Sequence, residues 1–195
     1  MDPFEQAENV RITNENFAPV REFLIHSGVL MREFERRGFS GDLMPYWQKI
    51  QEALALPLWP YNHARVIRLV ADKSLRKVSW PVLKKLLYEE RSDKLYNSET
   101  DPLRRRAMLK NDYVVERIVA ALGENVRKSQ SDELLELLND ERLGSNRILL
   151  IPAVRRVFGE KAKSILIELA KKPSLKIEAT HQLRKIERKL LSGNS

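Results

Sequence analysis

Pro152-Ala153-Val154-Arg155-Arg156-Val157 is the stretch that decides the fold of this 195-residue chain. Val154 and Val157 are three positions apart, as on one face of an α-helix, and two arginines stand between them. The same order, with two basic residues between two apolar ones, occurs at residues 83–86 and 183–186. Residues 118–122 have the apolar spacing without the basic pair. This recurrence predicts a repeated helix.

The four segments recur at similar intervals along the chain, and each follows a polar turn. Their closing apolar residues are 36, 35 and 29 positions apart. These residues are Leu86, Leu122, Val157 and Ile186. The stretch 69–85 also matches 169–185 at an offset of 100 positions, sharing serine, leucine and lysine residues. Two landmarks in the same order, four times, predict helix pairs at about residues 59–90, 101–123, 131–158 and 160–191. One pair cannot bury its apolar face alone, so we expect stacking, with the closing residues in equivalent buried positions.

On these residues the chain resembles the HEAT-like and armadillo-like helical repeat proteins, over roughly residues 59–191. The resemblance rests on the polar turn, the Leu/Ala/Val spacing and the basic pair in the second helix. The second pair departs from the pattern, because it lacks the basic residues and its helices are short. The resemblance implies an all-α fold, an α-solenoid of about four helix pairs that binds partners on a curved surface. It implies no particular chemistry, since this architecture serves many roles.

The N-terminal part differs from the rest in charge. Residues 1–60 carry 6 Lys and Arg against 9 Asp and Glu, whereas residues 61–195 carry 29 against 18. An apolar stripe over residues 16–37 and a second helix at about 42–56 precede the interruption Pro57-Leu58-Trp59-Pro60. We therefore predict a helical N-terminal segment, residues 1–58, that caps a HEAT-like repeat domain, residues 59–195.

Several classes of protein are excluded or disfavoured by composition. There are no cysteines, which excludes disulfides, thiolate metal sites and a cysteine nucleophile. The three histidines are far apart in sequence, and no P-loop or GxGxxG motif occurs, so we expect no metal and no cofactor. The acidic, polar N-terminus does not resemble a signal peptide, and no apolar run approaches the length of a membrane span. A cytoplasmic location is the expectation.

The tryptophans gather where the N-terminal segment meets the first helix pair. Trp47, Trp59 and Trp80 lie there in sequence, with Tyr46 and Tyr61. One interpretation is a core that seals the first repeat. The other is an aromatic platform on which a base or a peptide side chain stacks.

The basic pairs are the most informative candidate for a binding site. If Leu83 and Leu86 face the core, Lys84 and Lys85 point to opposite flanks of the exposed side, and the same holds for the pairs in the third and fourth repeats. In solenoids of helix pairs the second helix lines the concave face, which the resemblance implies. The predicted anion-binding groove consists of Lys84, Lys85, Arg155, Arg156, Arg184, Lys185 and Arg188. The alternative is that these cations only solvate the exposed side of each helix.

The sequence therefore favours a non-enzymatic interaction module whose basic concave face binds an anionic partner, either nucleic acid or an acidic protein segment. The chain is also similar in architecture and charge to HEAT-like alkylpurine DNA glycosylases, which implies an alternative function as an enzyme on DNA. The sequence does not assign an Asp to their catalytic position, so the catalytic residues of that alternative are unknown. A third interpretation is a protein scaffold whose charge is incidental. An Asp or Glu and a Trp from different repeats converging in one cleft would favour the enzyme.

Overall fold

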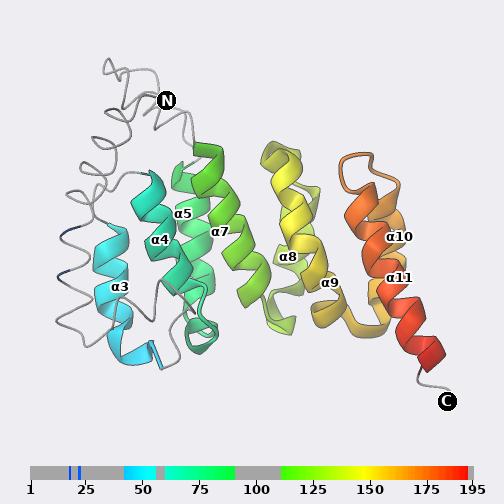
Figure 1. The fold of residues 1–195 in the computed structure, drawn as a ribbon, viewed down its shortest axis with the longest axis horizontal. Helices are drawn as coiled ribbons and strands as arrows, with labels where there is room; N and C mark the ends of the chain where they lie inside the picture. The colour runs from blue at the N-terminus through cyan, green and yellow to red at the C-terminus, as the bar shows by residue number, and fades with distance from the viewer. Residues whose placement is uncertain (1–17, 19–21, 23–41, 56–59, 91–110, 193–195) are drawn as a thin grey trace, which may run out of the picture. The chain divides into compact units, whose positions relative to one another are not determined.

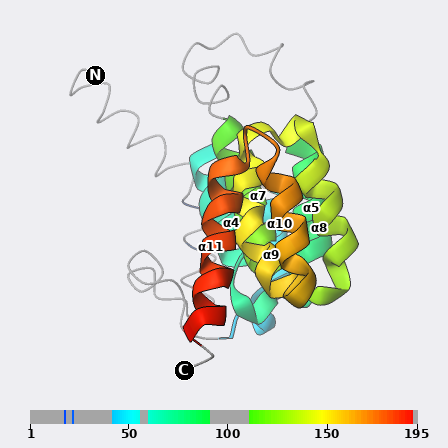
Figure 2. The same cartoon turned by 90° about the vertical axis from the view of Figure 1, so that its right-hand side faces the viewer.

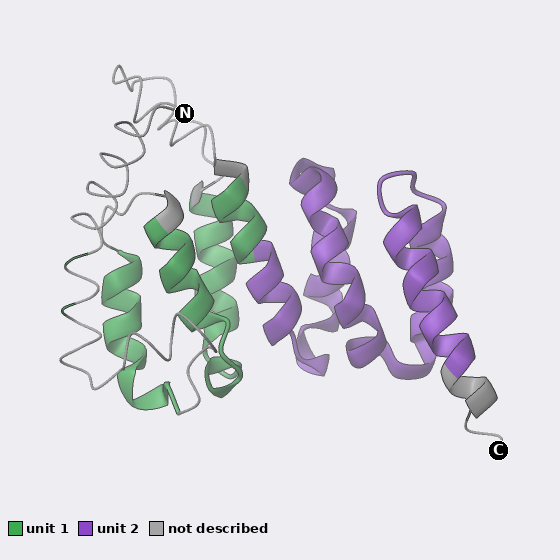
Figure 3. Cartoon of the chain, in the orientation of Figure 1, with its two compact units in different colours: residues 1–118 green, residues 119–195 purple. Residues whose placement is uncertain are grey.

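A computed structural model describes residues 18, 22, 42–55, 60–90 and 111–192 of the chain. The described part is predominantly helical and contains no β-strand, so the predicted all-α class is confirmed (Figure 1). The chain divides into two compact units, residues 1–118 and 119–195 (Figure 3). The boundary predicted between residues 58 and 59 falls in a stretch outside the described residues and stays a prediction. The helix expected within residues 16–37 lies almost wholly outside the described residues as well.

Unit 1 is built from helices that pack in chain order. The 3₁₀ helix η1 (Met44–Tyr46) leads into α3 (Trp47–Leu54), which packs against α4 (Pro60–Val70). The 3₁₀ helix η2 (Lys73–Leu75) connects α4 to α5 (Ser79–Glu90), and these two helices also pack together. The start of α7 (Asn111–Asn125) belongs to this unit. The first predicted helix pair, residues 59–90, therefore corresponds to α4 and α5.

Unit 2 contains the rest of α7 and two further helix pairs. The first pair is α8 (Ser131–Asn139) and α9 (Ile151–Phe158), with the 3₁₀ helices η4 (Lys128–Gln130) before α8 and η5 (Glu141–Leu150) between the two. The second pair is α10 (Ala162–Ala170) and α11 (Lys176–Ser192), preceded by η6 (Gly159–Lys161). Helix α9 packs against α8, α10 and α11, and α10 packs against α11 (Figure 2). These bounds agree with the predicted pairs at 131–158 and 160–191.

Each unit has its own apolar core. In both, leucine, isoleucine and valine side chains at helical spacing are buried, because burial of apolar surface drives the packing. The core of unit 1 includes Ile50, Ile67, Leu75, Trp80, Leu83 and Leu87. The core of unit 2 includes Leu122, Leu134, Leu138, Leu150, Val154, Leu166 and Leu175.

Three of the four closing residues are buried as predicted, namely Leu86, Leu122 and Val157. For Ile186 the prediction is wrong, since this side chain is only half-buried. The buried stripe of α11 continues from Leu175 through Ala179 to Gln182, and Ile186 lies at its less covered end. Leu183, the other residue of this helix predicted to face the core, is likewise only half-buried. Sequence spacing does not show how far along α11 its neighbours cover it.

A tight turn recurs between the paired helices. In each case a leucine amide donates to the carbonyl three residues earlier: Leu75 to Asp72 at 3.0 Å, Leu143 to Asp140 at 3.1 Å and Leu175 to Lys172 at 3.0 Å. All three leucines are buried. The polar turns before three of the four recurring segments are therefore one repeated structure, and the turn before residues 118–122 falls partly outside the described residues.

Candidate anion-binding surface

The two arginines of α9 reach in different directions. The Arg156 guanidinium donates to the carbonyl oxygens of Gly123 and Glu124, at 2.6 and 3.1 Å. These carbonyls lie in the last turn of α7, where backbone oxygens lack partners within the helix and carry partial negative charge. Arg156 is exposed, but its charge is used to hold the C-terminal end of α7.

Close packing fixes the end of α7 that Arg156 contacts. A Cβ atom placed on Gly123 would lie 2.7 Å from the carbonyl oxygen of Leu149 in η5. Because that oxygen is backbone and cannot rotate away, only glycine allows α7 and η5 to approach this closely. The absence of a side chain at Gly123 thus lets the end of α7 lie where its carbonyl oxygens accept from the Arg156 guanidinium.

Arg155 lies on the other flank of α9 and contacts α11. Its Nη1 lies 3.5 Å from Oε1 of Gln182, a residue that is buried. The Gln182 amide in turn donates to Oε1 of Glu178 at 2.6 Å. Gln182 was not among the predicted site residues. The sequence could have indicated it, because Gln182 continues the apolar stripe of Leu175 and Ala179, where helical spacing predicts an apolar residue.

The remaining three predicted cations of unit 2 share one side of α11. Arg184, Lys185 and Arg188 are all exposed, and none forms an ion pair with any residue that the structure describes. At about 100° per residue they fall, with His181, within an arc of about 100° that starts opposite the buried stripe at Arg184 and reaches to about 60° from Gln182 at Lys185. His181 is the member of this arc that contacts an acid, with Nδ1 3.5 Å from Oε2 of Glu178. The structure therefore brings Arg184, Lys185 and Arg188 together as one cationic face, which we call the α11 face.

Charge is segregated between the two helices of the first pair in unit 2. Helix α8 carries Asp132, Glu133 and Glu136 and no basic residue, whereas α9 carries two arginines and no acid. Helix α11 has acids only at Glu178 and Glu187. Because α9 packs against α11, the basic second helices are neighbours.

Lys84 and Lys85 belong to α5 in unit 1. Lys84 is half-buried, and Lys85 is 76% exposed with its Nζ 3.5 Å from Oε1 of Glu89, one turn further along the helix. The groove that would join these lysines to the cations of unit 2 stays a prediction. Arg104, Arg105 and Arg106, the other basic run in the sequence, lie outside the described residues.

The tryptophans divide between the core and partly exposed positions. Trp80 is 3% exposed, so its ring belongs to the core of unit 1 and offers no face for stacking. Trp47 is half-buried at the start of α3, and Trp59 lies outside the described residues. Trp80 therefore fits the interpretation as a core that seals the first repeat, and it does not belong to an aromatic platform.

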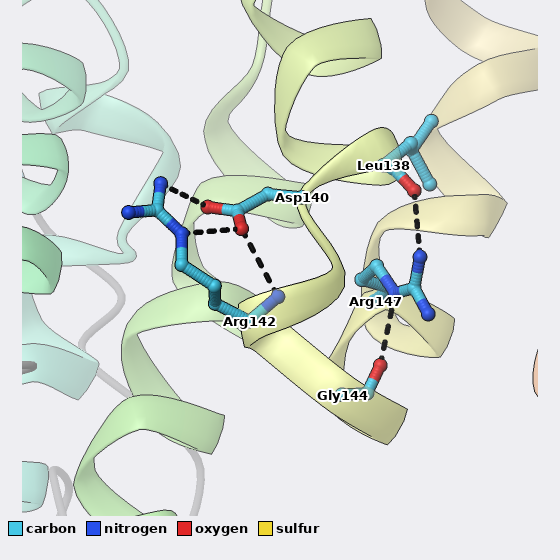
Figure 4. Close-up of polar contacts among 5 residues, drawn as sticks. All are labelled: Leu138, Asp140, Arg142, Gly144 and Arg147. Atoms are coloured by element: carbon cyan, nitrogen blue, oxygen red, sulfur yellow. Dashed lines mark hydrogen bonds and ion pairs between the residues drawn. The ribbon is translucent and has the colours of Figure 1, made fainter.

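Arg147 is a buried cation that the sequence analysis did not select as a site residue. It is 6% exposed, and its Nε donates to the carbonyl of Gly144 at 3.0 Å (Figure 4). Its two terminal nitrogens reach the Leu138 carbonyl at 3.5 Å and Ser174 Oγ at 3.3 Å. The carboxylate of Asp140 is bonded by Arg142, whose Nε lies 2.9 Å from Oδ1 (Figure 4). Arg147 follows Asn146 and precedes Ile148 in η5, and this local sequence has no pattern that predicts a buried arginine.

Within the described residues, no three histidine, aspartate or glutamate side chains gather as metal ligands. None of the described helices is both long and apolar enough to cross a membrane. Comparison with protein-family models, with curated proteins and with solved structures finds no match to this chain.

Proposed function

We propose that this chain is a non-enzymatic interaction module of the α-solenoid type that binds the phosphate backbone of nucleic acid through its basic second helices. The repeated turn supports the solenoid, since it gives three helix pairs the same connection around a buried leucine. Stacked pairs of this kind bury a continuous core that no pair can bury alone.

The observation that carries the proposed binding is the α11 face. Three cations without ion pairs to described residues lie on one side of a helix, next to the arginine-bearing α9. Unpaired, solvated cations in a row supply the counterion release that drives binding to phosphates. Interfaces between proteins are instead built around an apolar centre. Among the described side chains of α11, Ile177 is the only large apolar one that is exposed. Phosphate therefore fits this face better than an acidic protein segment.

The test is fluorescence anisotropy with duplex DNA, single-stranded DNA and RNA across a range of salt concentrations. We expect affinity to fall steeply with salt, with a log–log slope of about −0.9 per phosphate contact for duplex DNA. The variant R184E/K185E/R188E removes the α11 face and should flatten that slope by about 2 to 3 units. A matched control, K128E/K161E/K163E, makes the same charge change at exposed lysines outside α11.

The outcomes separate the proposal from its alternatives. If the α11 variant stays folded and binds like the parent while the control weakens, the cations of α11 only solvate the helix. If the parent binds none of the three nucleic acids at low salt, the proposed function is wrong. Arg156 is not used in this test, because its reversal would release the end of α7 and disturb the fold.

A further inference from the structure

The three recurring turns differ in how the backbone amide at their third position is satisfied. In unit 1 the Asp72 carboxylate accepts from the Ser74 amide at 2.8 Å and from the Ser74 hydroxyl at 2.6 Å. In the turn between α8 and α9, the Asp140 carboxylate accepts from the Arg142 amide at 3.1 Å. An aspartate at the first position thus closes both turns.

The turn between α10 and α11 lacks this carboxylate. Its first position is Lys172, and its third is Ser174. No described residue accepts a hydrogen bond from the Ser174 amide. The Ser174 hydroxyl accepts from Arg147, so its own proton is available to donate outward. Ser174 is an exposed residue, and the amides at its position in the other two turns both donate to a carboxylate.

Positive charge gathers at the same turn. The Arg147 guanidinium donates a hydrogen bond to the Ser174 hydroxyl. All the acceptors of this guanidinium among the described residues are neutral oxygens. A buried guanidinium ordinarily has an anionic partner, because the desolvated charge is costly. Lys172 bonds the side-chain oxygen of Asn139 at 2.7 Å, and Lys176 is exposed in the first turn of α11. Neither lysine forms an ion pair with a described residue.

We propose that this turn, defined by Arg147, Lys172, Ser174 and Lys176, binds one phosphate group in the place of the missing carboxylate. Phosphate oxygens accept from the Ser174 amide and hydroxyl, and the three cations balance the negative charge. The group is either inorganic phosphate or a phosphodiester of bound nucleic acid, and this second source rests on the proposed function. The turn precedes Arg184 by about ten residues, or about 15 Å along α11, so one polyanion can occupy both places.

The first experiment titrates inorganic phosphate into the full chain at constant ionic strength, with chloride as the reference. Amide NMR shifts of Ser174 and Leu175 should saturate with phosphate and not move with chloride. S174A removes one donor without changing charge and should weaken phosphate binding by up to about tenfold. K172D supplies the internal carboxylate of the other turns and should abolish the response, whereas the control K163D should leave it intact. No saturable shift in the parent, or parent-like binding by K172D, would overturn the proposal.

The second experiment distinguishes the two sources of phosphate. If a nucleic acid phosphodiester occupies the turn, inorganic phosphate competes with it, and S174A weakens oligonucleotide binding while leaving the fold unchanged. If inorganic phosphate binds but no oligonucleotide does, the phosphate site stands and the proposed function fails. If oligonucleotides bind and S174A and K172D both bind them like K163D, the phosphodiester source is wrong, and the inorganic titration alone decides the site.

Discussion

The stretches 69–85 and 169–185 have matching sequences and nearly matching burial through their first halves, but they differ further along. Leu75 and Leu175 are both buried, as are Ser79 and Ala179 four residues later. From the next residue on the two diverge. Trp80 and Leu83 are buried in unit 1, whereas Thr180 and Leu183 of α11 are half-buried.

This comparison separates local from tertiary causes of burial. The turn leucine is buried in both stretches, and in both its amide closes the same hydrogen-bonded turn. Leu83 and Leu183 occupy matching positions in the sequence, but α11 already begins at Lys176 whereas α5 begins only at Ser79. The difference in their burial therefore reflects both where the helix begins and which elements cover it. In α11, packing on α9 and α10 buries Ala179 and Gln182 but covers Leu183 only in part.

The largest expected effect is the contrast between Leu83→Ala and Leu183→Ala. Truncating the fully buried Leu83 should lower the free energy of unfolding by about 2–5 kcal/mol, because it removes apolar contacts and leaves a cavity. Truncating Leu183 should cost distinctly less, since water already reaches that side chain. Urea denaturation of the two variants measures the difference. Equal costs would show that Leu183 is covered as fully as Leu83.

The helical class and the helix pairs could be predicted because they depend on spacing that the sequence displays. The second helices α5 and α9 lie within their predicted ranges, and α11 ends one residue past its range. The half-burial of Ile186 could not be predicted, because it depends on which neighbours reach the second half of α11. Periodicity gives the direction of a side chain, and tertiary packing determines whether anything covers it.

The sequence predicted which cations are exposed better than it predicted what each of them binds. The cations Arg184, Lys185 and Arg188 are exposed as expected. Arg156 has the same sequence context, but its guanidinium donates hydrogen bonds to backbone carbonyl oxygens at the C-terminal end of α7. The partners of a long side chain are the acceptors that the fold brings near it. Here those acceptors are backbone carbonyl oxygens, which every residue has, so the sequence gives no sign of them.

A smaller effect is expected at the first position of the two turns. Asp72→Ala should lower the free energy of unfolding by about 1 kcal/mol, because it leaves the Ser74 amide without its acceptor. It also frees the Ser74 hydroxyl, which accepts from the Leu43 amide at 3.1 Å. The reciprocal change Lys172→Asp should raise stability by up to about 1 kcal/mol, since it adds the missing acceptor. Thermal or urea unfolding measures both signs, and a loss of stability in K172D would show that the turns are not equivalent.

The smallest effect concerns Lys85 and Lys185, which occupy matching positions with different partners. Lys85 pairs with Glu89 across one helical turn, and both side chains are more than half exposed, so the pair contributes about 0.3–0.5 kcal/mol at most. A double-mutant cycle of K85A with E89A should return a coupling of that size, which decreases as salt is added. K185A should leave stability unchanged, because Lys185 forms no ion pair with a described residue. For nucleic acid binding the order should reverse: an unpaired cation can replace counterions on a phosphate without first breaking an internal pair, so K185A should weaken binding more than K85A. If K85A weakens binding more, the basic surface that binds nucleic acid lies on unit 1, and the α11 face is not its principal contact.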